Sequence, residues 1–116
     1  MASGTIKKPI KFQLWVNPSP AASFAAQTVS VDLSIYDFYT VRCMQSTGNQ
    51  RTTGFFFCPV DEVVNNYQAV NNSGVISSRQ FSYSISDKEI SFGNARNNGS
   101  QDNGFCIPYD IWGIKL

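Results

Sequence analysis

Apolar side chains recur at every second position along much of this chain, and this period constrains the fold more than any other feature. In the segment 10–16, Ile10, Phe12, Leu14 and Val16 alternate with other residues, and 29–33 and 81–85 show the same alternation. Successive side chains of a strand point to opposite faces, so a period of two is typical of half-buried strands. The alternation predicts strands at residues 10–16, 27–33, 36–45, 53–60, 75–77, 79–86, 89–93 and 104–115.

The segments between these strands are rich in residues that form turns. They are NPSP at 17–20, STGNQ at 46–50, NNSG at 71–74 and NARNNGSQDNG at 94–104. Many short strands without helical crossovers predict an all-β chain, an antiparallel β-sandwich of jelly-roll type with little or no helix. We expect a flexible N-terminal segment at 1–9 and a single sandwich domain at 10–116. The segment 61–70 begins with acidic residues but is poor in helix formers, so one helical turn and an irregular crossover are equal interpretations.

Two hairpins are expected from the spacing of the strands. The dipeptide at 87–88 predicts a tight turn between the strands on either side. A longer hairpin centred between Gln50 and Arg51 would place Cys43 opposite Cys58. A disulfide there is one interpretation, and three buried thiols, with Cys106 the third, is the one we favour. An odd number of cysteines is typical of a protein assembled in a reducing compartment.

The last thirteen residues, GFCIPYDIWGIKL, are strongly apolar. Chain ends are usually poorly ordered unless the fold holds them in place. We therefore predict that this segment is a closing strand that pairs with an early strand. Within it Pro108 has no N–H to donate, so it is expected where the missing N–H faces away from the neighbouring strand, or at a bulge.

Composition excludes several classes of function. The net charge is +1, with no basic run for nucleic acid, and no apolar run approaches the ~20 residues of a membrane helix. The chain has no His and no C-x-x-C spacing, so we expect neither a metal nor another cofactor. The acidic neighbours Asp61 and Glu62, and the pair Asp87 and Glu89, are read as solvated residues at turns and strand ends. We expect no enzymatic activity.

What remains is a surface of amides and aromatic rings. Only 15% of the residues are charged, against roughly 25% in an average soluble domain. Aromatic rings among amides are typical of sugar-binding surfaces, although most aromatic residues in strands are core or subunit contacts. The loop 94–104 is longer than a hairpin needs and suits a neutral polyhydroxylated ligand, unless it is only solvated. The predicted ligand-binding residues are Trp15, Tyr39, Asn94, Arg96, Asn97, Asn98, Gln101 and Asp102.

Two separated stretches resemble a known family. LWVNPSPAASFAAQTVSVDLSIYDFYTV at 14–41 and FCIPYDIWGIKL at 105–116 are similar to the two ends of the C-terminal domain of tail fibre and minor tail proteins of bacteriophages and prophages. The segment 46–104 between them is not diagnostic. The resemblance implies a β-sandwich head at the tip of a virion fibre, commonly a homotrimer, that faces a bacterial surface. It also implies a tail component of the virion, made in the cytoplasm of the bacterial host.

These features together give the functional hypothesis. We expect a non-catalytic attachment module that binds a bacterial surface glycan or another receptor. A purely structural tail-assembly module without receptor binding is the alternative, and a hydrolase is the remote third. With few Lys or Glu to guard the strand edges, we also expect self-association. Nucleic acid and membrane insertion are not expected.

Overall fold

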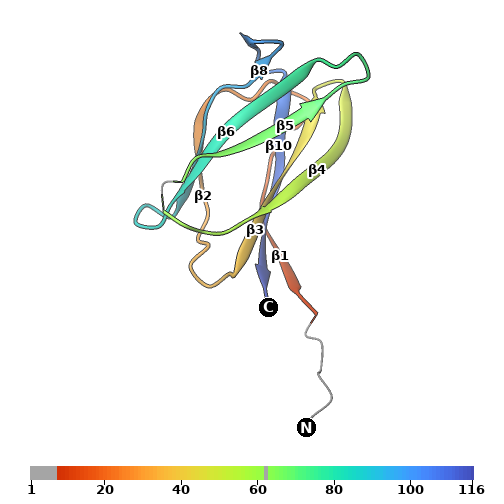
Figure 1. Ribbon diagram of the computed structural model, residues 1–116. Coiled ribbons are helices and arrows are strands. Elements are labelled where there is room, and N and C mark those ends of the chain that lie inside the picture. The colour runs from red at the N-terminus through yellow and green to blue at the C-terminus, as the bar shows by residue number, and fades with distance from the viewer. Residues whose placement is uncertain (1–7, 62) are drawn as a thin grey trace.

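The computed structural model describes residues 8–61 and 63–116 and consists of two antiparallel β-sheets packed face to face (Figure 1). The four-stranded sheet has the order β1 (Ile10–Val16), β10 (Phe105–Lys115), β3 (Phe38–Ser46) and β4 (Asn49–Phe57). The second sheet has the order β2 (Gln27–Ser30), β7 (Glu89–Phe92), β6 (Ile76–Ser84), β8 (Arg96–Asn97) and β9 (Ser100–Gln101), and β5 (Asn65–Val70) also pairs with β6. The described residues contain no helix. The predicted all-β antiparallel sandwich is confirmed, and the jelly-roll winding stays a prediction.

The C-terminal strand β10 lies in the interior of its sheet. It pairs with β1 on one side and with β3 on the other, so the expectation that the chain end pairs with an early strand is confirmed. The register with β3 shifts between Pro108 and Asp110, which places the proline beside a bulge as expected. Because β10 joins β1 to β3, the last residues of the chain complete the four-stranded sheet.

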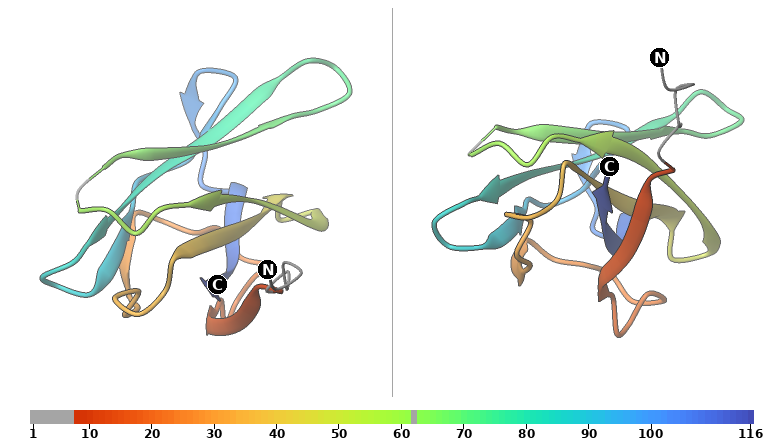
Figure 2. Two further views of the ribbon diagram at one scale, coloured as in Figure 1. Left: turned by 60° about the horizontal axis from the view of Figure 1, so that its bottom comes forward. Right: turned by 90° about the horizontal axis from the view of Figure 1, so that it is seen from below.

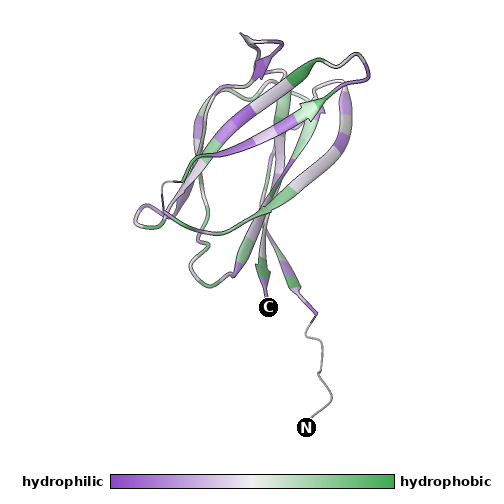
Figure 3. Ribbon diagram, in the orientation of Figure 1, coloured by the Kyte–Doolittle hydropathy of each residue, from purple (hydrophilic) through white to green (hydrophobic). Residues whose placement is uncertain are grey.

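The core fills the space between the two sheets. Alternating residues of β3, β6 and β10 supply most of it, including the fully buried Val41 and Ile111, which are neighbours in the register. Coloured by hydropathy, the strands alternate between hydrophobic and hydrophilic residues (Figure 3). Seen after rotation, the β5–β6 hairpin forms an upper layer above β3 and β4 (Figure 2). The period-two reading of the sequence corresponds to this two-layer arrangement.

Several predicted strand boundaries are wrong, among them 53–60 for β4 and 27–33 for β2, and two further segments are instructive. The predicted strands 75–77 and 79–86 form one strand, β6, that continues through Ser78. The segment 61–70, interpreted as a helical turn or a crossover, contains strand β5 instead. Tyr67 and Ala69 of β5 face the core and their neighbours face solvent, so pairing with β6 outweighs the ambiguous local propensity. Glu62 lies outside the described residues.

The hairpins differ from prediction at their turns. β3 and β4 are joined through Thr47 and Gly48, so Cys43 lies opposite Thr53 and the predicted pairing of Cys43 with Cys58 is wrong. The turn comes earlier in the chain than predicted, and the register shifts beside it. The residue opposite Cys43 is therefore five positions before the predicted one. All three cysteines are free; Cys43 and Cys106 are buried as expected, but Cys58 is exposed. The predicted β6–β7 hairpin exists, with a four-residue turn at 85–88 in place of the two-residue turn.

Candidate functional site

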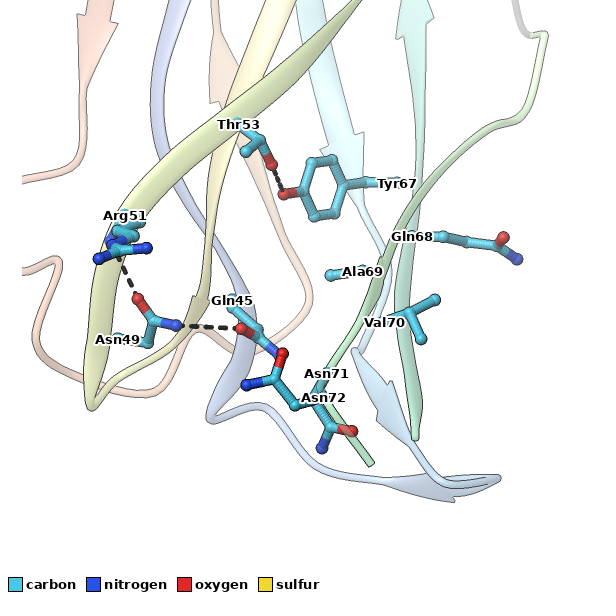
Figure 4. A pocket seen from close by; sticks show the side chains of 10 residues that line it. All are labelled: Gln45, Asn49, Arg51, Thr53, Tyr67, Gln68, Ala69, Val70, Asn71 and Asn72. Carbon is cyan, nitrogen blue, oxygen red and sulfur yellow. Dashed lines mark hydrogen bonds between the residues drawn. The ribbon is translucent and has the colours of Figure 1, made fainter. Parts of the chain in front are cut away.

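An amide-lined depression lies between the tips of the β3–β4 and β5–β6 hairpins (Figure 4), and we call it the hairpin pocket. Its volume is about 460 Å³. Amide and hydroxyl side chains dominate its lining, and the residue with a charge is Arg51. The lining residues are Gln45, Asn49, Arg51, Thr53, Tyr67, Gln68, Ala69, Val70, Asn71 and Asn72.

Hydrogen bonds within each hairpin tip order the pocket. Asn49 Nδ2 donates to Gln45 Oε1 at 3.0 Å, which ties the two strands together beside their turn. On the other hairpin, Asn71 Oδ1 accepts from the backbone N–H groups of Ser73 and Val75, both at 2.9 Å. Asn side chains that bond to nearby backbone N–H groups stabilise turns of this kind. The amides therefore hold the walls of the pocket in place.

A hydroxyl pair links the two sheets at the inner end of the pocket. The hydroxyls of Thr53 on β4 and Tyr67 on β5 share a hydrogen bond, and Tyr67 also donates to the carbonyl of Cys43 at 3.3 Å. Burial is the main cause that raises the pKa of Tyr67, so this phenol remains neutral at physiological pH. The inner end of the pocket thus carries neutral donors and acceptors.

The direction of the side chains separates the groups that face the pocket from those that do not. The amides of Gln45 and Asn49 face those of Asn71 and Asn72 across the gap, whereas Gln68 points away (Figure 4). No carboxylate or imidazole is among the lining residues. The lining offers hydrogen-bond donors and acceptors to a neutral, hydroxyl-rich ligand and no general acid or base.

Sequence reasoning missed the hairpin pocket although a signal was present. The segments 46–50 and 71–74, both rich in amides, were interpreted only as turns. Each turn is local, but the two lie beside one another because β3–β4 and β5–β6 belong to facing sheets (Figure 1). The two turns are close together because the sheets pack on each other, and neither segment alone contains that information.

The predicted binding loop 94–104 forms a small hairpin. β8 and β9 pair with each other, and β8 pairs with β6 through Asn97 opposite Ser77. Asn98 and Gly99 form the turn with φ angles of 51° and 81°, the left-handed conformation that Asn-Gly turns supply. The loop is therefore an ordered extension of the second sheet.

Three of the predicted loop residues meet in one depression of about 300 Å³, the loop pocket. Asn94, Arg96 and Gln101 lie there together with polar residues of β5 and β6. The complete lining is Asn66, Ser78, Arg79, Gln80, Gly93, Asn94, Arg96 and Gln101. The loop pocket is smaller than the hairpin pocket and equally rich in amides.

The other predicted loop residues have different surroundings. Asn98 lies in an adjacent depression, which Arg96 also lines. Asn97 is half-buried and Asp102 is exposed, and neither lines the loop pocket. Asp102 Oδ1 accepts from the N–H of Gly104 at 3.0 Å, so its carboxylate stabilises the end of the loop.

Asn94 is both a loop-pocket residue and a structural one. Its Oδ1 accepts from the N–H of Ala26 and from Asn103 Nδ2, each at 3.0 Å. These bonds join the loop to the segment that precedes β2. Substitution of Asn94 would therefore affect the loop itself, which makes this residue a poor probe of binding.

The two aromatic residues predicted to contact a ligand lie in different surroundings. Tyr39 is fully buried in the core, and its hydroxyl accepts a hydrogen bond from Asn65 at 3.1 Å, so its assignment as a ligand contact was wrong. Burial is the main cause that raises the pKa of Tyr39 to about 12. Trp15 is half-buried, packs edge-on against Phe24 with ring centroids 6.3 Å apart, and lines a third depression far in sequence from the loop. Trp15 and Tyr39 join neither amide pocket.

Comparison of the chain with protein-family models, with curated proteins and with solved structures finds no match. Within residues 8–61 and 63–116, no group of three His, Cys, Asp or Glu side chains is placed to hold a metal ion. The same part of the chain contains no helix long and apolar enough to cross a membrane.

Proposed function

We propose that this protein is a non-catalytic attachment module of phage-tail type that binds a neutral saccharide of the bacterial surface. The hairpin pocket is the observation that carries the proposal: amides from two hairpins face one another across a depression of about 460 Å³ without a carboxylate in the lining. Amide groups exchange hydrogen bonds with sugar hydroxyls as donors and acceptors. The resemblance of residues 14–41 and 105–116 to tail fibre proteins supplies the biological setting.

The position of the hairpin pocket supports this role. It lies at the tips of two hairpins, where binding residues stand on a rigid scaffold and reach a large partner without obstruction. Its amides are already ordered by hydrogen bonds, so less conformational entropy is lost when a ligand binds. The loop pocket, which contains Asn94, Arg96 and Gln101, is a secondary contact site in this proposal.

A glycan array screened with the intact chain tests the proposal. The double variant Arg51→Ala and Asn72→Ala removes one hydrogen-bonding side chain of the pocket lining from each hairpin and should weaken binding of the best neutral glycan by about tenfold or more, because each lost hydrogen bond contributes about 1 kcal/mol. Gln68→Ala is the matched control, since this amide belongs to the same region but points away from the pocket. Gln101→Ala reports separately on the loop pocket.

Two outcomes would contradict the proposal. One is the absence of any glycan binding by the folded chain in its native oligomeric state. The other is equal affinity of the double variant and the Gln68→Ala control for the best glycan. Cleavage of a bound glycan would contradict the non-catalytic part alone.

A structural tail-assembly module is the second candidate, favoured by a different observation. The edge strand β4 exposes Phe55, with 53% of its surface accessible. Exposed apolar side chains on an unpaired edge favour contact with another chain. Self-association through this edge, as a homotrimer or another oligomer, fits both candidates. Loss of adsorption with normal tail assembly in the double variant would separate attachment from assembly.

The proposed location is the tail of the virion, after synthesis in the cytoplasm of the bacterial host. The three free thiols support synthesis in a reducing compartment. Nucleic acid, membrane insertion and a cofactor have no part in the proposal.

A further inference from the structure

Another depression lies on the outer face of the four-stranded sheet, on the opposite side of the molecule from the loop pocket. All four strands of that sheet contribute to it, and its volume is about 220 Å³. Its lining differs from the amide pockets because it combines aromatic rings with cations. We call it the aromatic slot, and its residues are Lys11, Thr40, Arg42, Gly54, Phe56 and Trp112.

The register of the strands explains why this part of the sheet is hollow. Thr40 on β3 lies opposite Trp112 on β10 and opposite Phe56 on β4, so a short side chain separates two aromatic ones in a single row. Neighbouring strands are about 4.8 Å apart, which places the backbones that carry the two rings about 10 Å from each other. A space of this width between two rings accepts a small ring-shaped ligand.

Gly54 deepens the slot because it has no side chain to fill it. A Cβ atom at this position would lie 2.7 Å from Thr40 Oγ1 and 3.1 Å from Arg42 Cγ, so a larger residue would displace both neighbours. A glycine inside a strand often marks a place where another group approaches the backbone closely. Here the missing side chain leaves room for Thr40 Oγ1 and Arg42 Cγ, and both residues line the slot.

The charges around the slot leave one cation without an ion-pair partner among the described residues. Arg42 Nε donates to Asp110 Oδ1 at 2.7 Å, and Arg42 Nη2 bonds to the other carboxylate oxygen. Asp110 is fully buried, so Arg42 and this carboxylate compensate each other. Lys11 is exposed, lies 5.9 Å from the centroid of the Trp112 ring and forms no ion pair with any described residue. The slot therefore has a net positive charge at one end.

We propose that the aromatic slot binds a monosaccharide-sized ring that carries a carboxylate, such as a uronic acid unit of an acidic polysaccharide. The Lys11 ammonium pairs with the carboxylate, and the Thr40 hydroxyl bonds to a ring hydroxyl. The exposed Phe56 ring covers the apolar face of the sugar, as aromatic side chains do in other sugar sites. This site is separate from the hairpin pocket and requires a different ligand class, so its existence does not depend on the neutral-glycan proposal.

Titration of the full chain with two matched probes tests the inference. Methyl glucuronide carries the carboxylate and methyl glucoside does not, and binding is followed by amide chemical shifts in ¹H–¹⁵N NMR spectra. The expected result is saturable binding of the glucuronide, with shifts at Thr40, Gly54 and Trp112, and at least about tenfold weaker binding of the glucoside. Lys11→Gln should reduce glucuronide affinity by about tenfold, and Phe56→Ala should reduce the affinity for both probes.

Lys115→Gln is the charge-matched control. Lys115 pairs with Ile10, which is the residue before Lys11 in β1. Successive residues of a strand point to opposite faces, and paired residues point to the same face, so Lys115 lies on the other face of the sheet from Lys11. Its affinity for the glucuronide should equal that of the unmodified chain. Equal binding of the two probes, an equal loss with Lys115→Gln and Lys11→Gln, or no saturable binding of the glucuronide would each overturn the inference. None of these results would affect glycan binding at the hairpin pocket.

Discussion

Asp110 is a fully buried carboxylate in the middle of the closing strand. Arg42 holds it with two hydrogen bonds, and Gln13 Nε2 donates a third at 3.1 Å. Burial alone would raise the pKa of Asp110, but these bonds, with the nearby Trp112 indole, lower it below its ordinary value. The buried carboxylate of Asp110 is therefore compatible with the fold only while Arg42 is present to compensate its charge.

Removal of the cation tests this interaction. Arg42→Met leaves the Asp110 carboxylate buried without its partner and should lower the free energy of unfolding by about 2 to 3 kcal/mol, less than for a fully buried pair because Arg42 is partly exposed. Lys88→Met breaks the exposed pair with Asp32 and should leave the free energy of unfolding almost unchanged. Urea unfolding at pH 7 measures both. Equal losses in the two variants would show that the Asp110 pair is unimportant.

Tyr39 makes the stability of the fold sensitive to alkali. Its pKa is about 12 in the folded chain and about 10 when unfolded, so between these values the unfolded chain loses the proton while the folded chain keeps it. The contribution is fully present below about pH 10 and decreases by up to about 1.4 kcal/mol per pH unit up to about pH 12. The pKa of Tyr67 is also raised, so a second phenol adds to the decrease.

The variant Tyr39→Phe isolates this effect. It removes the titrating hydroxyl and the hydrogen bond from Asn65, so it should be less stable at pH 8 but lose less stability between pH 9 and 11 than the unmodified chain. Urea unfolding at several pH values measures the slope. Parallel slopes for the two proteins would contradict the assignment of the alkaline transition to Tyr39.

At the scale of elements, strand β10 depends on a close contact at its C-terminal end. A Cβ atom at Gly113 would lie 2.6 Å from the ring of Tyr36, which packs on this part of the strand. The contacted atoms belong to the rigid ring of Tyr36, which also packs on Phe12 with ring centroids 5.8 Å apart, so they cannot move away as the end of a flexible side chain does. Gly113 is required by packing, and its backbone angles are not the reason.

Gly113→Ala should therefore lower the free energy of unfolding by about 1 to 3 kcal/mol, the usual cost of overpacking. Gly93→Ala is the control, because a Cβ there would meet only the carbonyl of Gln80 at an ordinary 3.5 Å. It should cost under about 1 kcal/mol. A Gly113→Ala protein as stable as the Gly93→Ala protein would mean that Tyr36 moves without cost.

At the scale of the whole molecule, both outer edges of the four-stranded sheet expose apolar side chains that favour association with another chain. The β4 edge carries the exposed Phe55, and the β1 edge carries the exposed Ile10, Phe12 and Val16. The described part of β4 has Arg51 as its charged residue and no proline to block pairing. We expect a second copy of the chain at the β4 edge, and the β1 edge is the alternative.

Sedimentation velocity tests which edge is used. Phe55→Lys places a charge on the β4 edge and should convert the oligomer to a monomer, whereas Val16→Lys on the β1 edge should leave the oligomer intact. The two positions have similar exposure, 53% and 47%, so the comparison is matched. A monomer that persists at high concentration in the unmodified chain would contradict self-association.

The sequence by itself determined the type of fold. The alternation in segments such as 10–16 and 79–86 predicts strands because the two-residue period is a local property of an extended backbone. The apolar chain end predicts a closing strand because it has to be buried. The Asn-Gly pair at 98–99 belonged to a segment correctly interpreted as a turn, since its backbone preference is local too.

Only the tertiary structure decided which residues meet. A turn two residues long and a register shift beside it place Thr53, and not Cys58, opposite Cys43. Tyr39 lies on the core face of its strand, whereas Thr40 beside it opens to the aromatic slot. The amides at 45–49 and 71–72 become one pocket because two sheets stack. Register and stacking follow from the packing of distant side chains, and a local sequence pattern does not contain that information.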